Sequence, residues 1–219
     1  MTDINIQTDY WNKVAREKEF THPINMSLLR THLSLSSKIL DYGCGYGRVC
    51  QKLAEEGYTS IFGIDSSVEM IQRGCEQYPE LSLEILPSSG LDYSDNSFDA
   101  VLLIAVLTCI PTNAGQKSLL TDLKRILRPK GMIYISDYVL QDDKRNQQRY
   151  QQNAEEFGTY GVFRLPERTV VRHHSIDWIH TLTSSFETLD LVYPEVVTMN
   201  GHRAKAFQYL GSKREIPQS

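Results

Sequence analysis

The chain has 219 residues, enough for one α/β domain with a sizeable core. A hydrophobic fraction of 41% and a charged fraction of 23% are typical of a globular protein, and the net charge of -4 disfavours a general nucleic-acid binder. The N-terminus has no basic n-region and no apolar h-region, and no apolar stretch approaches about 18 residues, so we expect neither a signal peptide nor a membrane span.

Strands and helices are predicted to alternate through most of the chain. An amphipathic helix at 8–20 begins an N-terminal helical segment that extends to about residue 35. Short apolar runs and helical spacing then predict five strands and three helices. The strands are 37–43, 59–65, 81–86, 97–107 and 132–138, and the helices are 48–57, 66–79 and 116–131.

Local signals mark the ends of these helices. Gly57 stands where a C′ glycine ends the helix 48–57. Ser66 and Glu69 have the spacing of a capping box at the start of the next helix, and Pro79 ends it. Pro129 and Gly131 form the turn before the fifth strand.

Two regions break the alternation. Residues 139–172 are polar, carry tyrosines and arginines, and have weak periodicity, so we expect a lid insertion over the carboxyl edge of the sheet. After a helix at 175–185, strand-like runs at 187–199 and 202–213 flank Asn200-Gly201, a strong hairpin signal.

Together these elements predict a single α/β domain that spans residues 1–219. Strand–helix alternation implies a doubly wound, mostly parallel sheet with right-handed crossovers. With the two C-terminal runs, we expect a seven-stranded, Rossmann-like sheet that ends in an antiparallel hairpin.

Three glycines follow the first strand in "ILDYGCGYGR" (39–48). Gly43, Gly45 and Gly47 allow unusual φ angles and let a ligand touch the backbone at the carboxyl edge, where doubly wound sheets bind ligands. A dinucleotide fingerprint needs a small residue where this chain has Arg48. The fingerprint is therefore broken, and the alternatives are a different ligand or a tight turn without one.

The run 39–48 resembles the first motif of class I S-adenosylmethionine-dependent methyltransferases. The run "FGIDSS" (62–67) is similar to that family's second motif, and 97–111 and 123–138 are similar to the stretches around its fourth and fifth strands. The four segments agree in order and spacing over about residues 35–140. The similarity is greatest to small-molecule methyltransferases, a group that includes the quinone-biosynthesis enzymes.

The resemblance implies S-adenosylmethionine as the cofactor and S-adenosylhomocysteine as its product. Asp41 is expected to accept from the cofactor ammonium, and backbone at Gly43 and Gly45 to approach the methionine moiety. Asp65 is expected to accept from both ribose hydroxyls, the alternative being a solvated strand end or a helix cap. Because the cofactor has no phosphate, Arg48 is tolerable at the start of the helix.

The adenine corner departs from the family pattern. Pro87 stands where the family often has an acidic residue for the adenine amino group. Ser88, Ser89 or a backbone carbonyl must then serve, or the amino group faces water. Ile64 and Met70 are candidates to flank the adenine, although a core position on its helix is the favoured role of Met70.

The N-terminal helix is a candidate cover for the cofactor. Either Tyr10 or Trp11 closes over it, as N-terminal segments do in the family, or both pack against the sheet edge. The complete predicted cofactor set is Tyr10, Asp41, Gly43, Gly45, Gly47, Asp65, Ser66, Met70, Ser88, Ser89 and Ile104.

The end of the fourth strand argues against nucleic-acid methylation. It has neither the motif of adenine methyltransferases nor the Pro-Cys nucleophile of cytosine methyltransferases. Cys109 lies among apolar residues, which favours a core cysteine. Acids nearly balance bases in the insertion 139–172, which the resemblance does not cover, so we expect a small, partly apolar acceptor beneath it.

A general base near neutrality suits an oxygen or ammonium acceptor, and histidine is the usual choice. His173-His174 is the one histidine cluster in the sequence. One of these two histidines is therefore the candidate catalytic base. Adjacent side chains on an extended segment point opposite ways, so at most one of them faces a given pocket. For either histidine, the alternative to catalysis is a structural or solvent-facing role. The predicted acceptor-binding residues are Tyr138, Tyr160 and Arg172.

The sequence thus predicts in-line methyl transfer from S-adenosylmethionine to a small molecule, without a metal, a nucleic-acid partner or a membrane partner. Four scattered cysteines, with no Cys-x-x-Cys pair, indicate reduced thiols in a cytoplasmic protein. The alternatives are an NAD(P)-linked oxidoreductase, disfavoured by Arg48 and the terminal hairpin, and a non-catalytic cofactor-binding module. Neither the acceptor nor the oligomeric state follows from the sequence.

Overall fold

The computed structural model describes residues 3–215, and its centre is one mixed sheet in the order β3-β2-β1-β4-β5-β10-β8, with β9 paired to β10. Strands β1 to β5 run parallel, and β10 is antiparallel to β5 and β8. The strands of this sheet are β1 Lys38–Tyr42, β2 Ser60–Asp65, β3 Ser82–Ile85, β4 Phe98–Ile104, β5 Leu127–Tyr138, β8 Phe186–Val192, β9 Glu195–Val197 and β10 Arg203–Lys213. The predicted doubly wound, mostly parallel sheet is confirmed.

Helices cover both faces, and a small second sheet follows β5. The helices are α1 Asp3–Val14, α2 Met26–His32, α3 Arg48–Glu55, α4 Val68–Gln77, the 3-10 turn η1 Leu107–Cys109, α5 Asn113–Ile126, α6 Lys144–Phe157 and α7 Ile176–Thr183. The second sheet pairs β6 Val162–Arg164 with β7 Val170–Arg172. None of the helices within residues 3–215 combines the length and the apolar character needed to cross a membrane.

The continuous apolar run of β4 reflects burial on both faces. Val101 and Leu103 pack in the core beneath α5 and α7, whereas Ala100 and Leu102 pack in the core beneath α2 and α3. Successive strand residues point to opposite faces, so a central strand with helices on both sides needs apolar residues at every position.

Three local predictions differ from the structure. Ser67, not Ser66, caps α4, because its side chain accepts from the Met70 N–H at 3.2 Å. The expected turn before the fifth strand lies inside β5, where the left-handed φ of 62° at Lys130 accompanies a shift in register with β4. The N-terminal segment is not helical throughout, since a non-helical stretch, residues 18–25, precedes α2.

The insertion after β5 contains a full helix that the sequence pattern did not predict. Asp143 caps α6 by accepting from the Asn146 N–H at 3.1 Å. Only Asn146 and Tyr150 of this helix are buried, so its sequence lacks the apolar stripe that marks an amphipathic helix. In contrast, the hairpin predicted at Asn200-Gly201 is present between β9 and β10.

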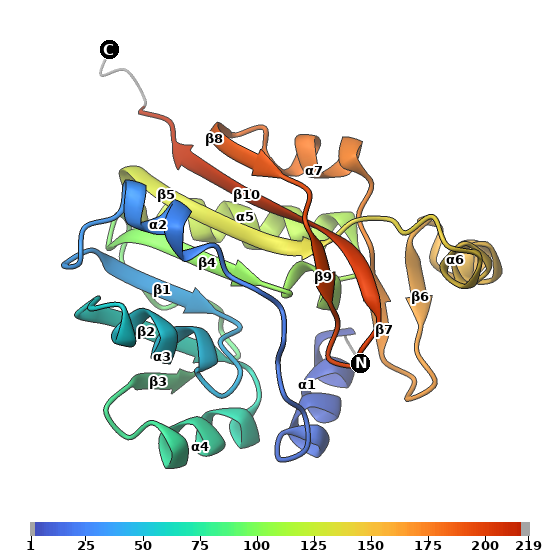
Figure 1. Cartoon of the computed structure of the whole chain (residues 1–219), viewed down its shortest axis with the longest axis horizontal. Helices are drawn as coiled ribbons and strands as arrows, with labels where there is room; N and C mark the ends of the chain where they lie inside the picture. Colours follow the sequence, from blue (N-terminus) through green and yellow to red (C-terminus); the bar gives the residue numbers. More distant parts are fainter. Residues whose placement is uncertain (1–2, 216–219) are drawn as a thin grey trace.

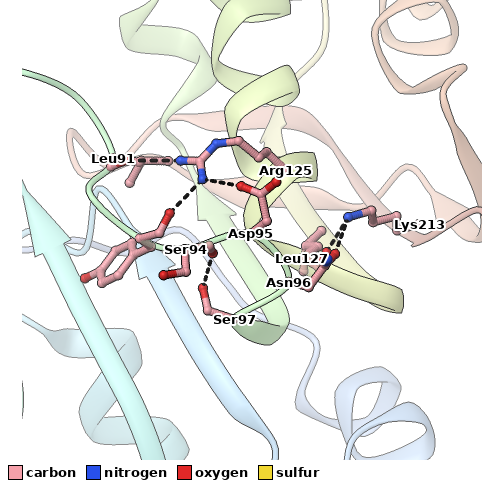
Figure 2. A network of polar contacts seen from close by, with 9 residues as sticks. Leu91, Ser94, Asp95, Asn96, Ser97, Arg125, Leu127 and Lys213 are labelled. Atoms are coloured by element: carbon pink, nitrogen blue, oxygen red, sulfur yellow. Dashed lines mark hydrogen bonds and ion pairs between the residues drawn. The ribbon is translucent and has the colours of Figure 1, made fainter.

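The loop between β3 and β4 is fixed at its far end by α5 and β10. Arg125 donates to the carbonyls of Leu91 at 3.1 Å and Tyr93 at 2.7 Å. Lys213 donates to the Asn96 side chain at 2.9 Å (Figure 2). These bonds immobilise a loop whose first residues reach the carboxyl edge of the sheet.

The carboxyl ends of the parallel strands point toward the side of the molecule where α1, β7 and β9 gather (Figure 1). Doubly wound sheets bind ligands at this edge, near the switch in strand order. Here the switch lies between β1 and β4, which pair directly although two strands separate them in the chain.

Candidate active site

A cavity of about 1280 Å³ lies at this edge of the sheet. Ligand pockets commonly measure roughly 300–1,000 Å³, so the cavity has room for a cofactor and a second molecule. The sequence-predicted site residues that line it are Tyr10, Asp41, Gly43, Asp65, Ser66, Met70, Ser88, Ile104, Tyr138 and His173. Those that do not line it are Gly45, Gly47, Ser89, Tyr160, Arg172 and His174.

The glycine turn is left-handed at all three glycines, with φ of 73° at Gly43, 57° at Gly45 and 81° at Gly47. Gly43 lines the cavity, as predicted from the motif. Gly45 is not among the residues that line the cavity, and a Cβ atom there would overlap the ring of Phe20. The turn therefore needs glycine both for its backbone angles and for the chain that crosses it.

Asp65 joins the end of β2 to the glycine turn. Its Oδ2 accepts from the Gly45 N–H at 2.8 Å, and its Oδ1 accepts from the Ser67 N–H at 2.8 Å. Burial raises the pKa of Asp65, while these N–H donors lower it. Each oxygen of the Asp65 carboxylate has a second lone pair that can accept a hydrogen bond. Because Asp65 lines the cavity, the two hydroxyls of a vicinal diol fit there as donors to this carboxylate.

Asp41 and Arg48 place a carboxyl group and a guanidinium on the cavity wall. Burial raises the pKa of Asp41 to about 7, and the Cys50 thiol and the Arg48 guanidinium oppose that rise. Arg48 Nη2 donates to the His22 carbonyl at 2.5 Å, whereas its buried Nε has no partner among the described residues. An amino-acid group fits this pair, with its ammonium toward Asp41 and its carboxylate toward Arg48. Sequence reasoning did not assign Arg48 to the site.

Helix α1 spans the cavity from α4 to β7. Asn12 accepts from the Ser67 hydroxyl at 2.7 Å, and Gln7 donates to the Val170 carbonyl. These contacts hold Tyr10 and Trp11 on the cavity wall, where the sequence predicts a cover over the cofactor.

The adenine corner is only partly as expected. Met70 is fully buried in a small core with Tyr46 and also contributes to the cavity wall. Ser88 lines the cavity beside Pro87, but the exposed Ser89 does not. The two serines therefore cannot both contact a ligand here.

Three predicted acceptor-side residues point elsewhere. His174 is buried, with its ring bonded to Gln116 at 2.9 Å and to the Tyr138 carbonyl at 3.0 Å. Arg172 donates to the Pro111 carbonyl at 3.1 Å and does not itself line the cavity. Tyr160 is about half exposed on the surface of the insertion. These three side chains contribute to the structure around the cavity and do not form part of its lining.

A family model described as a methyltransferase domain matches residues 33–193. The chain belongs to this family. The resemblance to class I S-adenosylmethionine-dependent methyltransferases is thereby confirmed, as is S-adenosylmethionine as the cofactor at the level of the family. Among residues 3–215, no group of three or more His, Cys, Asp or Glu side chains is placed to hold a metal ion.

Individual relatives of this methyltransferase domain are distant. A demethylmenaquinone methyltransferase of Tropheryma whipplei is 25% identical over 141 residues, covering 58% of this chain and 57% of the relative. A phosphoethanolamine N-methyltransferase of Zea mays is 30% identical over 149 residues, covering 65% of this chain and 26% of the relative. The chain thus spans about half the length, or less, of these curated relatives.

Solved structures share the fold of the methyltransferase domain. A methyltransferase from Methanosarcina mazei has a TM-score of 0.81 and 24% identity, covering 86% of this chain and 98% of its own. A didemethyltoxoflavin N1-methyltransferase from Burkholderia thailandensis, solved with S-adenosylhomocysteine, has a TM-score of 0.66 and 19% identity, covering 97% and 86%.

The sequence predicts that Cys109 lies in the core, but in the structure it lies on the cavity wall of the methyltransferase domain. Burial raises the pKa of its thiol to about 12. The thiolate is the nucleophilic form of cysteine, so Cys109 does not act as a nucleophile near neutral pH.

His173 is the histidine of the pair that faces the cavity. Its Nδ1 lies 2.6 Å from the Tyr150 hydroxyl, whose oxygen also accepts from the Gln141 N–H at 3.1 Å. The hydroxyl hydrogen is therefore assigned to the bond with Nδ1, and the ring hydrogen to Nε2. Burial, and then the Arg149 guanidinium, lower the pKa of His173 to about 3, which makes the imidazole a neutral donor and a poor general base.

We expect the His173 imidazole to stay neutral as the pH falls from 8 to about 5, because its pKa lies well below the ordinary value of about 6.5. The Cε1–H proton resonance of His173, assigned with a His173→Gln variant, is then constant over this range. Exposed His180 supplies the reference for a ring in contact with water. A midpoint near the ordinary value would instead favour the general-base hypothesis.

Proposed function

We propose that this methyltransferase domain transfers a methyl group from S-adenosylmethionine to a small-molecule acceptor. The observation that carries the proposal is the combination of Asp41, Arg48 and Asp65 on the wall of one cavity. This set complements an amino-acid group and a ribose, and the cavity volume leaves space for an acceptor. The cofactor-binding residues and the space for the acceptor both lie at the edge of the sheet that carries the three-glycine turn.

In this reaction the main roles of the chain are to orient the cofactor and the acceptor and to exclude water. Bound S-adenosylmethionine supplies an activated methyl group on a sulfonium. Tyr10 and Trp11 on α1 and His173 beyond the end of β7 line the same cavity and restrict access of water. Orientation and desolvation provide much of the rate of such transfers, so a strong general base within the chain is unnecessary for an acceptor that loses its proton readily.

A small-molecule acceptor is supported by the relatives and by charge. The two relatives described above are named for demethylmenaquinone and phosphoethanolamine, which are chemically different small molecules. The net charge of -4 disfavours nucleic acid. All four cysteines are free, which supports a reducing compartment and hence the proposed cytoplasmic location.

Calorimetric titration tests the cofactor and separates the alternatives. We expect the protein to bind S-adenosylhomocysteine and to show no heat of binding with NAD or NADP, because Arg48 occupies the position that a dinucleotide fingerprint keeps small. Release of S-adenosylhomocysteine in an acceptor screen then distinguishes an enzyme from a binding module. Binding of NAD(P) without S-adenosylhomocysteine would overturn the proposal.

A further inference from the structure

Two guanidinium groups without a carboxylate partner lie at the acceptor end of the cavity. Arg145 and Arg149 are one helical turn apart on α6, and both line the cavity. None of the ion pairs in the described part of the chain includes either one. Arg149 is half-buried, and its polar contact is the Asn146 Oδ1 at 3.4 Å.

The acids around this corner form no direct ion pair with Arg145 or Arg149 among the described residues. Asp143 caps the first turn of α6 through the Asn146 N–H and side chain. Asp142 pairs with Lys205 at 2.6 Å, and Glu156 pairs with Arg164. Burial, and after it the Arg145 guanidinium, lower the pKa of Arg149, and the Asp143 carboxylate opposes that shift. Asp143 thus offsets part of the positive charge, and the two guanidiniums still outnumber this one carboxylate at the corner.

Glu167 is the acid that lines this side of the cavity, and it acts on another group. Burial, and after it the Glu167 carboxylate, raise the pKa of Tyr10 on α1. Among the ion pairs of residues 3–215, none joins Glu167 to either arginine. Glu195 of β9 likewise pairs with Arg203, at 3.8 Å, on the outer rim.

His173 adds a third donor to the same corner. Its Nδ1 is taken by Tyr150, and its Nε2 is neither bonded to a described residue nor among the buried unpartnered atoms. Burial, and after it the Arg149 guanidinium, lower the pKa of His173, while the Asp143 carboxylate opposes that shift. The Arg149 guanidinium and the His173 ring also contact the same Phe163 ring. Arg145, Arg149 and His173 thus all offer N–H donors to a ligand, and none of them carries a negative charge.

Apolar and aromatic side chains form the walls beside these donors. The Arg149 guanidinium lies 5.4 Å over the Phe163 ring, and the His173 ring meets the same phenylalanine edge-on at 5.1 Å. Leu165 and Met199 also line the cavity. The surface suits a flat or apolar body that ends in a group accepting several hydrogen bonds.

We propose that the methyl acceptor carries an oxyanion, either a carboxylate or a phosphate monoester, which Arg149 and Arg145 bind with His173 as an additional donor. Guanidinium groups bind both anions through paired, charge-assisted hydrogen bonds. The apolar part of the acceptor packs against Phe163. This inference rests on the proposed function, since it concerns the second molecule in the same cavity.

The test measures binding of benzoate, phenyl phosphate and neutral benzamide to the S-adenosylhomocysteine complex of the full chain. We expect at least one anion to bind, and benzamide to bind at least about 10-fold more weakly, the scale of a lost charge-assisted hydrogen bond. Comparison of benzoate with phenyl phosphate separates the two oxyanions. Failure of both anions to bind, or equal binding of benzamide, would overturn the inference.

Variants assign the effect to the arginines. Arg149→Gln is expected to lower the affinity for the anion by about 10- to 100-fold. Arg145→Gln is expected to lower it by a smaller factor, because Arg145 is more exposed. Arg164→Gln is the matched control, because Arg164 is exposed on the same insertion, pairs with Glu156 and does not line the cavity. An unchanged affinity in Arg149→Gln would contradict the assignment.

Binding of S-adenosylhomocysteine to each variant keeps the two proposals distinguishable. Its affinity is expected to stay unchanged in Arg149→Gln, because no hydrogen bond or ion pair among the described residues joins the Arg149 side chain to Asp41, Arg48 or Asp65. If the wild-type chain binds no S-adenosylhomocysteine, the proposed function fails. If it does but does not discriminate anion from amide, only the acceptor inference fails.

Discussion

Asp65→Ala is expected to weaken the binding of S-adenosylhomocysteine by about 10- to 100-fold, the equivalent of about 1.5–3 kcal/mol for lost hydrogen bonds to a charged group. The substitution removes the carboxylate proposed to accept from the ribose. It also leaves the Gly45 and Ser67 N–H groups without their acceptor. Calorimetry gives the affinity, and chemical unfolding gives the accompanying loss of stability, expected at about 1–3 kcal/mol.

Asp122→Ala is the matched control for Asp65→Ala. Asp122 also lines the cavity, but it lies exposed on α5 and makes none of the bonds that hold the glycine turn. We expect its affinity for S-adenosylhomocysteine to stay within about 2-fold of the wild type, as for most exposed substitutions. Equal weakening in both variants would mean that net charge, and not the position of Asp65, controls binding.

The parts of the fold that follow from short-range patterns were predictable. The run at 97–107 predicts a strand buried on both faces, and β4 indeed contributes side chains to two separate cores. The three-glycine turn and Asp65 were assigned to one edge because parallel strands end together, and they are hydrogen-bonded in the structure. Period and turn chemistry are properties of neighbouring residues, so the sequence displays them directly.

Other parts depend on contacts between distant segments. The sequence shows Arg48 only as a break in the dinucleotide fingerprint, whereas its position reflects the chain around His22, which crosses the glycine turn. Alternation predicts that one of His173 and His174 faces the cavity but not which one. That choice is made by Gln116 of α5, which holds His174 inside. Helix α6 was missed because tertiary packing of Tyr150, not an apolar stripe, anchors it.

Gly45→Val is expected to lower the free energy of unfolding by about 2–5 kcal/mol and to abolish measurable cofactor binding. A side chain at the left-handed φ of 57° costs about 1–2 kcal/mol. Overlap of the new atoms with the Phe20 ring adds about 1–3 kcal/mol. Since Phe20 stacks on Tyr46 at 5.1 Å, its displacement also disturbs the N-terminal cover of the cavity.

Alanine variants separate the two contributions to the Gly45 effect. Gly158 has a similar φ of 61°, but no atom lies within 4 Å of an added Cβ, so Gly158→Ala measures the backbone cost alone. Gly45→Ala is expected to cost at least about 1 kcal/mol more than Gly158→Ala, through overpacking. The excess should shrink in a Phe20→Ala background, where the colliding ring is absent, and urea unfolding of the four-variant cycle measures this coupling. An excess that persists without the Phe20 ring would show that overlap with this ring is not its source. Close passage of the N-terminal segment over the turn would then not be its reason.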